Sequence, residues 1–367
     1  MNTAHTRGLT TVLAVTRLTL RKTFFARRSL WVYLLAFAPL FLFTAHTFLA
    51  PRDETRLTKI AAENRVSSKA LASIRLGARI EDVVNKLGEP YQRHDRQRRI
   101  EGGPGNDGKL IDRTTLRYTD GKLDVAFRFT DRVLDSVNRK SPGTLADDTL
   151  IFATVFQLYF LRLAVFFGCV GIFTNLFRGE MLDKSLHFFL LTPMRRETLL
   201  LGKFLSGLIA TIVIFTLSAA LQYLVVLARY DRAAVTEFMA AQGWSHLRDY
   251  AGVTALACVA YGSVFLGAGL FFKNPIIPAA VVLVWEAANV FVPITLKKLG
   301  IIYYLQSLCP VVATPDIDMP AILKLLISDA PPVSAFGALL SLGTITVLLI
   351  LAACFRARQL EINYGTD

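Results

Sequence analysis

The feature that most constrains this chain is a series of long apolar stretches, each able to cross a lipid bilayer. A spanning helix needs about 20 mostly apolar residues to cover a hydrocarbon core of about 30 Å. The first stretch contains no Lys, Arg, Asp or Glu. Six stretches meet the requirement: residues 30–50, 150–177, 199–228, 250–272, 275–296 and 334–355. The sequence therefore predicts an α-helical polytopic membrane protein with six transmembrane helices.

Charge is concentrated outside these stretches, and most of all between the first and the second. The 367 residues are 53% hydrophobic and yet carry a formal net charge of +13. Residues 51–148 hold a dense mixture of charged and polar side chains, which is costly inside a membrane. We therefore expect three parts: residues 1–50 with a surface helix and the first span, residues 51–148 as a water-soluble insertion, and residues 149–367 with five more spans.

The distribution of Lys and Arg predicts which ends face the cytoplasm. Short cytoplasmic loops are richer in these residues than short external loops, whereas long loops cross largely regardless of charge. With the N-terminus inside, the cytoplasmic segments hold 14 Lys and Arg residues and the short external loops hold 6. Both termini are therefore predicted on the cytoplasmic side of the membrane, with residues 51–148 on the opposite side.

Residues 9–28, before the first span, mix basic and apolar side chains and contain no acid. The apolar residues between the arginines are Leu9, Val12, Leu13, Leu20 and Phe24. An amphipathic helix of this kind can lie on the anionic inner leaflet. The alternative is an ordinary helical extension of the first span.

The insertion shows the patterns of a small α+β module. Residues 78–87 place apolar side chains at helical spacing and are followed by Gly88, a stop signal. Strands are predicted over 113–119 and 122–129, joined at Asp120-Gly121, and a third strand over 133–138. We expect one or two helices packed on a three-stranded antiparallel sheet.

The insertion resembles the SmpA/OmlA (BamE-type) envelope module over roughly 70 residues. The matching positions are Gly77, Val83, Leu87, Gly88 and Pro90. The resemblance implies a small periplasmic module close to protein or peptidoglycan, with no known chemistry. The insertion lacks the lipoprotein cysteine of that family, so anchoring in an outer membrane is not implied.

A glycine-rich stretch in the insertion imitates a nucleotide-binding loop. Gly103 to Lys109 fits G-x-x-x-x-G-K, but Leu110 stands where a Ser or Thr must hold Mg²⁺. No buried strand is expected before it. The stretch is therefore predicted to be a solvated loop that binds no nucleotide.

The segment between the second and third spans is predicted to form a short amphipathic helix. Leu182, Leu186, Phe189 and Leu190 form one apolar face, and Glu180 and Asp183 lie on another. Pro193 should end this helix, because the residue before a proline resists the helical conformation. Such a helix can fill a groove on a partner or rest on the membrane surface. Its charges are too few for a nucleic-acid patch, so no nucleic-acid partner is expected.

The residues around this helix resemble the membrane subunits of type-2 ABC exporters. The matching positions are Glu180, Leu190, Thr192-Pro193, Arg196 and Gly202-Lys203, and Val284-Trp285-Glu286 is similar to a tryptophan–acid pair of some such permeases. The insertion departs from many members, which have only a short loop there. The resemblance implies a permease that encloses a translocation pathway with a second permease chain, identical or different, and is driven by a separate ABC ATP-binding subunit.

Residues 180–196 are therefore predicted to couple the chain to that ATPase. Apolar anchors and residues that fix the register make up the predicted set: Glu180, Asp183, Leu186, Phe189, Leu190, Pro193 and Arg196. No catalytic residue, cofactor or metal site is expected in the chain itself.

Two ionisable residues are predicted inside the bilayer, Arg162 in the second span and Glu286 in the fifth. A lone charge at that depth costs about 2.5–3.5 kcal/mol on insertion scales, so such residues usually pair or face a cavity. We expect the two side chains to approach each other, or Glu286 to line the pathway between subunits. The alternative is that Arg162 reaches the membrane surface and Glu286 only supports helix packing.

Two other classes of function fit the sequence less well. An envelope-assembly or scaffold protein could display the periplasmic module, but a single anchor would serve that purpose. A membrane-embedded enzyme would need a nucleophile or metal motif, and neither H-E-x-x-H nor G-x-S-x-G occurs. The four cysteines and five histidines are too scattered for a metal site.

Overall fold

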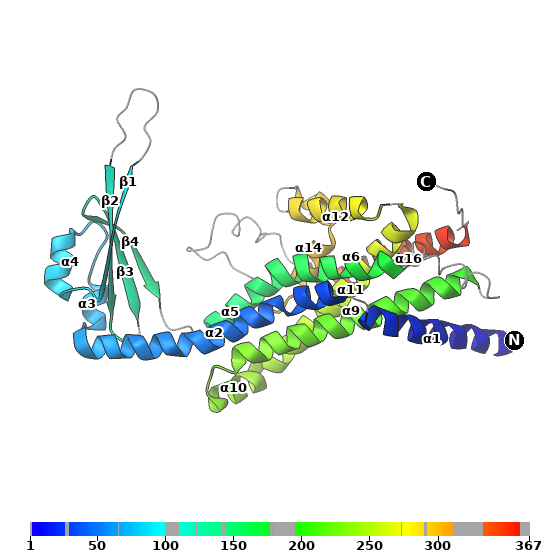
Figure 1. The fold of residues 1–367 in the computed structure, drawn as a ribbon, viewed down its shortest axis with the longest axis horizontal. Coiled ribbons are helices and arrows are strands. Elements are labelled where there is room, and N and C mark those ends of the chain that lie inside the picture. Colours follow the sequence, from blue (N-terminus) through cyan, green and yellow to red (C-terminus); the bar gives the residue numbers. More distant parts are fainter. Residues whose placement is uncertain are drawn as a thin grey trace, which may run out of the picture. The chain divides into compact units, whose positions relative to one another are not determined.

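A computed structural model describes most of the chain (Figure 1). The described residues are 2–25, 29–64, 66–99, 110–121, 123–140, 144–176, 179, 195–272, 274–289, 292–311 and 333–359. They form two compact units, one of residues 1–43 and 149–367 and one of residues 44–148. We call the first the membrane unit and the second the inserted module.

The regular elements of the membrane unit are all helices within its described residues. Its elements are α1 (Asn2–Phe25), the first part of α2 (Ser29–Asn64), α5 (Leu145–Val155), the π-helix η1 (Phe156–Val165), α6 (Phe166–Phe173), α9 (Arg196–Leu227), α10 (Arg232–Phe238), the π-helix η2 (Met239–Gly243), α11 (Trp244–Phe271), α12 (Ile276–Ala288), α13 (Ile294–Lys297), α14 (Ile301–Ser307) and α16 (Ala335–Arg358). Five helical stretches are long and apolar enough to cross a membrane: Ser29–Leu49, Leu145–Phe173, Arg196–Leu227, Arg232–Phe271 and Ala335–Arg358. A helical polytopic membrane protein is thereby confirmed.

The predicted count of six spans is not confirmed, because the fifth predicted span is shorter than expected. Residues 275–296 form only the 13-residue helix α12, which ends at Ala288, and the four-residue helix α13 begins after Pro293. A helix of 13 residues rises about 20 Å, less than the hydrocarbon core of about 30 Å. The apolar run is interrupted because polar side chains near the end of α12 bind the chain that follows.

Glycines allow the helices of the bundle to pack around Phe173 at the end of α6. A Cβ added at Gly207 of α9 would lie 2.7 Å from the Phe173 ring, and one at Gly262 of α11 would lie 2.6 Å from it. Small residues let membrane helices approach closely. The resulting van der Waals contacts hold the helices together, because there is no hydrophobic driving force between helices in lipid. The second, third and fourth spans are therefore interlocked at this ring.

Helix α1 packs along the first turns of α9. Val15, Thr16 and Thr19 are buried on this side, and the Thr16 hydroxyl donates to the main-chain carbonyl of Gly202 at 3.0 Å. A Cβ at Gly202 would lie 2.9 Å from Val15 and 3.1 Å from the Val12 carbonyl oxygen. Gly202 is thus required by the close approach of two helices.

We expect Gly202→Ala to loosen α1 from α9, because the added methyl group meets both a side chain and the backbone of α1. The cost should be about 1–3 kcal/mol, as for other overpacked sites. Limited proteolysis of α1 and the melting temperature in detergent measure the effect. Val15→Ala should recover part of the loss in the double variant; additive effects of the two substitutions would contradict this packing.

The inserted module is an antiparallel sheet with helices on one face. After the last part of α2 come α3 (Ser68–Ala72), α4 (Ile80–Leu87), β1 (Gln92–Arg99), β2 (Leu110–Thr119), β3 (Asp124–Thr130) and β4 (Val133–Lys140), and the strands follow the order β1-β2-β3-β4. Its core joins apolar residues of the helices and strands: Leu71, Ile74, Ile80, Val83, Leu87, Leu116, Tyr118, Val125, Phe127, Phe129 and Leu134.

The predicted helix and hairpin of the module are confirmed, but the sheet has four strands rather than three. Gly121 in the β2–β3 turn has φ +90°, a conformation that favours glycine. The unpredicted strand, β1, has the sequence QRHDRQRR. It lies at the edge of the sheet, so its side chains show no apolar alternation. The glycine-rich stretch 103–109 that follows it lies outside the described residues.

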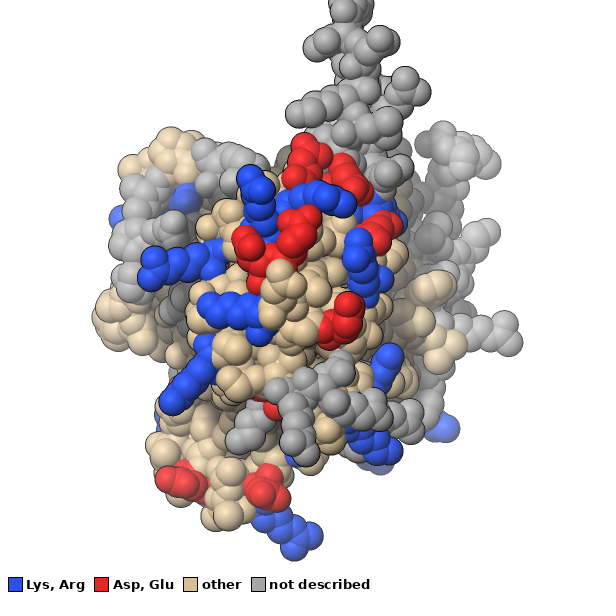
Figure 2. All heavy atoms as spheres, turned by 90° about the vertical axis from the view of Figure 1, so that its left-hand side faces the viewer, with Lys and Arg blue, Asp and Glu red and all other residues tan. Residues whose placement is uncertain are grey.

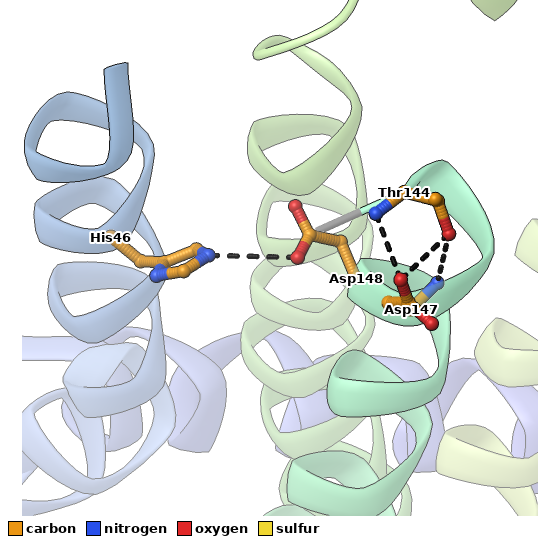
Figure 3. A network of polar contacts seen from close by, with 4 residues as sticks. All are labelled: His46, Thr144, Asp147 and Asp148. Atoms are coloured by element: carbon orange, nitrogen blue, oxygen red, sulfur yellow. Dashed lines mark hydrogen bonds and ion pairs between the residues drawn. The ribbon is translucent and has the colours of Figure 1, made fainter. Parts of the chain in front are cut away.

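The two ends of the module are held together by polar contacts (Figure 3). At the start of α5, Asp147 accepts from the Thr144 amide at 2.9 Å, and Thr144 accepts from the Asp147 amide at 3.2 Å. This reciprocal arrangement stabilises the first turn of the helix, as a capping box does. The next residue, Asp148, is buried, and its carboxylate lies 3.5 Å from Nε2 of His46 on α2. The two connections of the module are therefore fixed side by side.

Candidate functional site

The predicted coupling segment is only partly within the described residues. Glu180, Asp183, Leu186, Phe189, Leu190 and Pro193 lie outside them, whereas Arg196 is described as the first residue of α9. The structure therefore shows what holds the two ends of this segment.

Lys203 holds the end of the second span. Its side chain is completely buried, and its ammonium donates to the main-chain carbonyl of Leu176, just past α6, at 2.9 Å. The last carbonyls of a helix have no partner within the helix, and a positive charge near them is favourable. The Gly202-Lys203 pair thus has two roles, with glycine admitting α1 and lysine binding the end of α6.

The start of the third span is held by the end of the last one. Arg358 of α16 forms an ion pair with Glu197 of α9, and Arg196 donates to the main-chain carbonyl of Arg358 at 3.0 Å. These residues and Arg195 line a shallow hollow on the surface. Arg196, predicted from its motif position, is therefore in a contact between two spans.

The end of the fourth span meets the same place. A Cβ added at Gly269 of α11 would lie 3.1 Å from the main-chain oxygen of Thr174, next to the end of α6. The ends of α6, α11 and α16 and the start of α9 therefore lie at one end of the bundle (Figure 1). We call this place the junction. The sequence marks Gly202-Lys203 and Arg196 by their motif positions and Gly269 as a glycine suited to helix packing, but it does not show that these residues meet Glu197 and Arg358.

The second candidate site surrounds Glu286, near the end of α12. Its buried carboxylate accepts from the main-chain amides of Ile301 at 2.8 Å and Ile302 at 3.1 Å. These are the first residues of α14, whose amides have no partner within the helix. Glu286 therefore binds the chain that follows α12 back onto α12.

Neighbouring residues make this return possible. Asn289 donates to the main-chain carbonyl of Lys297 at 3.3 Å. A Cβ added at Gly300 would lie 2.2 Å from the Asn289 amide nitrogen and 3.3 Å from a carboxylate oxygen of Glu286. A side chain at position 300 would therefore separate the two parts.

The π-helix of the second span binds α12 and the chain that follows α14. Gln157 donates to the main-chain carbonyl of Val311 at 2.6 Å. Nη1 of Arg162 lies 3.4 Å from the main-chain carbonyl oxygen of Glu286. Residues five apart diverge by about 140° around an α-helix. In a π-helix, where hydrogen bonds join residues i and i+5, they lie nearly above each other. The π geometry of η1 thus turns Gln157 and Arg162 toward one side, where Val311 and Glu286 lie.

Arg162 approaches Glu286 at the main chain of Glu286. The contact involves the main-chain carbonyl of Glu286, while its carboxylate is engaged by the two amides of α14. Arg162 thus contacts the backbone of α12, and Glu286 joins α12 to the start of α14.

We expect Glu286→Gln to weaken the attachment of α14. A glutamine amide offers one acceptor oxygen in place of two and brings an NH₂ group against amide donors. An unsatisfied buried amide costs about 1–3 kcal/mol. A lower melting temperature of the purified chain and faster hydrogen exchange at residues 301–307 would show the effect. Glu237→Gln, on the surface helix α10, is the control and should leave both unchanged; equal behaviour of the two variants would contradict the capping role.

The comparison with protein families decides the family of the chain. Residues 21–356 match the model of the family described as ABC-2 family transporter protein. The chain belongs to the ABC-2 transporter family. Comparison with curated proteins and with solved structures finds no significant match.

Membership of the ABC-2 family establishes the general role of the chain. It is a multi-pass membrane protein and a permease subunit of an ABC transporter. The resemblance of the inserted module to the SmpA/OmlA family is not confirmed and stays a prediction. Within the described residues, no group of three or more His, Cys, Asp and Glu side chains is placed to bind a metal ion.

Proposed function

We propose that this ABC-2 permease is the membrane half of an ATP-driven exporter of the bacterial inner membrane. Two permease chains, identical or different, would enclose one pathway, and a separate ATP-binding subunit would dock on residues 180–196. The junction is the observation that supports this proposal. Both ends of the docking segment lead into it, at Leu176 and at Arg196. A displacement of the segment would therefore act on the second, third, fourth and last spans together.

The junction also supports a cytoplasmic location of both termini. It contains the end of α11 and the end of α16, so the chain between these helices must return to the opposite end of the bundle before α16 begins. Residues 272–334 would then cross the membrane an odd number of times in spite of the short α12. This agrees with the predicted topology, in which residues 51–148 are periplasmic.

Helix α1 fits a place on the inner leaflet in this topology. One side of it packs on α9, and the exposed residues of the rest include Arg17, Arg21 and Lys22 as well as Leu13 and Leu18. Basic and apolar side chains together suit the boundary between anionic headgroups and acyl chains.

We expect Phe189→Asp to abolish copurification of the ATP-binding subunit, because a charge replaces a central apolar anchor of the docking helix. Phe188→Asp is the matched control, since the neighbouring phenylalanine lies off the predicted apolar face. Loss of a central anchor should weaken the complex by about 2 kcal/mol or more, which is about thirtyfold. Retention of the partner by the Phe189 variant, or equal loss in both variants, would show that the segment docks differently.

We expect a cysteine introduced at Asn106 to react with an impermeant thiol reagent in cells whose outer membrane alone has been permeabilised. Three native cysteines are buried and Cys354 is partly exposed, so a Cys354→Ser background is suitable. A cysteine at Arg195, at the junction, should react only after the inner membrane is opened. The opposite labelling pattern would invert the topology.

A further inference from the structure

The inserted module carries an arginine cluster that the transport role does not use. Alternate residues of its strands point to opposite faces of the sheet. Leu116, Tyr118 and Phe127 belong to the core on the helix-covered face. Arg113 and Arg128 alternate with core residues and are exposed, so they lie on the opposite face. We call that opposite face the outer face.

The register of the strands brings three arginines of the outer face together. Arg96 of β1 lies directly opposite Arg113 of β2. Arg113 lies opposite Thr130 of β3, so Arg128, two residues earlier, is its diagonal neighbour. Directly opposed side chains have Cβ atoms about 4.5–5.5 Å apart, and diagonal ones are about 7–8 Å apart. All three side chains are exposed.

The arginine cluster places unpaired like charges side by side, whereas neighbouring arginines of the sheet are paired with acids. On the same two strands, Arg93 is paired with Asp95 at 3.0 Å, and Arg117 is paired with Asp124 at 2.6 Å. Arg96, Arg113 and Arg128 have no hydrogen bond or ion pair to any other residue within the described part of the chain. Like charges directly opposite each other destabilise a sheet, so an anion between them would remove a repulsion.

The face that bears α4 has a different charge pattern. Figure 2, seen from that side, shows Lys and Arg side chains interspersed with Asp and Glu. Asp124, at the far end of β3, is buried and already paired with Arg117. Closer to the cluster, Asp131 accepts from the main-chain amide of Asp112, and Asp135 lies at the bulge of β4 beside Ser136, which is opposite Arg128. Neither forms an ion pair with Arg96, Arg113 or Arg128 in the described part of the chain, so a ligand can neutralise the three arginines.

The spacing and the residue type favour phosphate over a single carboxylate. A carboxylate has two oxygens, which one planar guanidinium can bind, whereas a phosphate has further oxygens for a second guanidinium and for hydroxyl donors. We propose that Arg96, Arg113 and Arg128 form a binding site for a ligand with two neighbouring phosphate groups. Arg96 and Arg113 converge on the first group, and Arg128 binds the second. The phosphates come either from a soluble diphosphate or from lipid headgroups.

The full-length chain in nanodiscs of zwitterionic lipid tests this site with inorganic pyrophosphate as the probe. Calorimetric titration at low salt compares R96Q/R113Q with the matched control R93Q/R132Q, which removes the same charge from exposed, acid-paired arginines of the module. Loss of two charge-assisted contacts should weaken binding about tenfold or more, whereas the control should change it less than about twofold. Equal weakening in both variants, or no binding by the unmodified chain, would overturn the proposal.

Nanodiscs that contain anionic phospholipid distinguish the two sources of phosphate. If lipid headgroups occupy the site, the affinity of the unmodified chain for pyrophosphate falls more in anionic discs than that of R96Q/R113Q. If the ligand is soluble, the affinity of the unmodified chain stays well above that of R96Q/R113Q in both kinds of disc. Either result keeps the phosphate site and assigns its source; an affinity of the unmodified chain no higher than that of R96Q/R113Q in both kinds of disc would remove it.

Discussion

The buried charge of Lys203 is the constraint on which the arrangement of the membrane unit depends. An ammonium without water is expensive unless it is bound by acceptors, and the carbonyl of Leu176 is one such acceptor. The end of α6 must therefore lie beside the second turn of α9. Gly202, the residue before Lys203, leaves room for α1, and Gly269 lets α11 pack against the end of α6. The ion pair between Glu197 and Arg358 joins α16 to the start of α9. The buried charge thus fixes one contact of the junction, and two close glycine approaches and an ion pair complete it.

The same requirement explains the irregular region after α12. Backbone groups outside helices are tolerated within a membrane protein only where other protein groups bind them. The carboxylate of Glu286 binds two amides of α14, and the π-helix of the second span supplies Gln157 and Arg162 for two carbonyls. Polar residues that are isolated within apolar sequence thus bind backbone amides and carbonyls around α12 and α14. The two sites place polar side chains at the ends of helices, where the free amides and carbonyls are.

The sequence was sufficient for features that depend on local patterns. Apolar length identified the long spans, and Asp120-Gly121 identified the β2–β3 hairpin. It was insufficient where partners are distant along the chain. The shortness of α12 depends on the contact of Glu286 with residues 15 and 16 positions later, and the edge strand β1 depends on pairing with β2. Likewise, Arg162 and Glu286 could be singled out as membrane charges, but not the backbone groups that they bind. The coupling residues 180–193 rest on the family resemblance and on their amphipathic pattern.

We expect the junction to move as one body when the proposed ATP-binding subunit changes its nucleotide state. Distances between spin labels in the assembled transporter, on the Cys354→Ser background, measure this motion. Labels at Arg195 and Gln359 span the junction, and a label at Arg229, at the other end of α9, reports its distance to the second permease chain. Nucleotide should change the distance between the two chains and leave the distance across the junction unchanged. A change across the junction, with none between the chains, would contradict it.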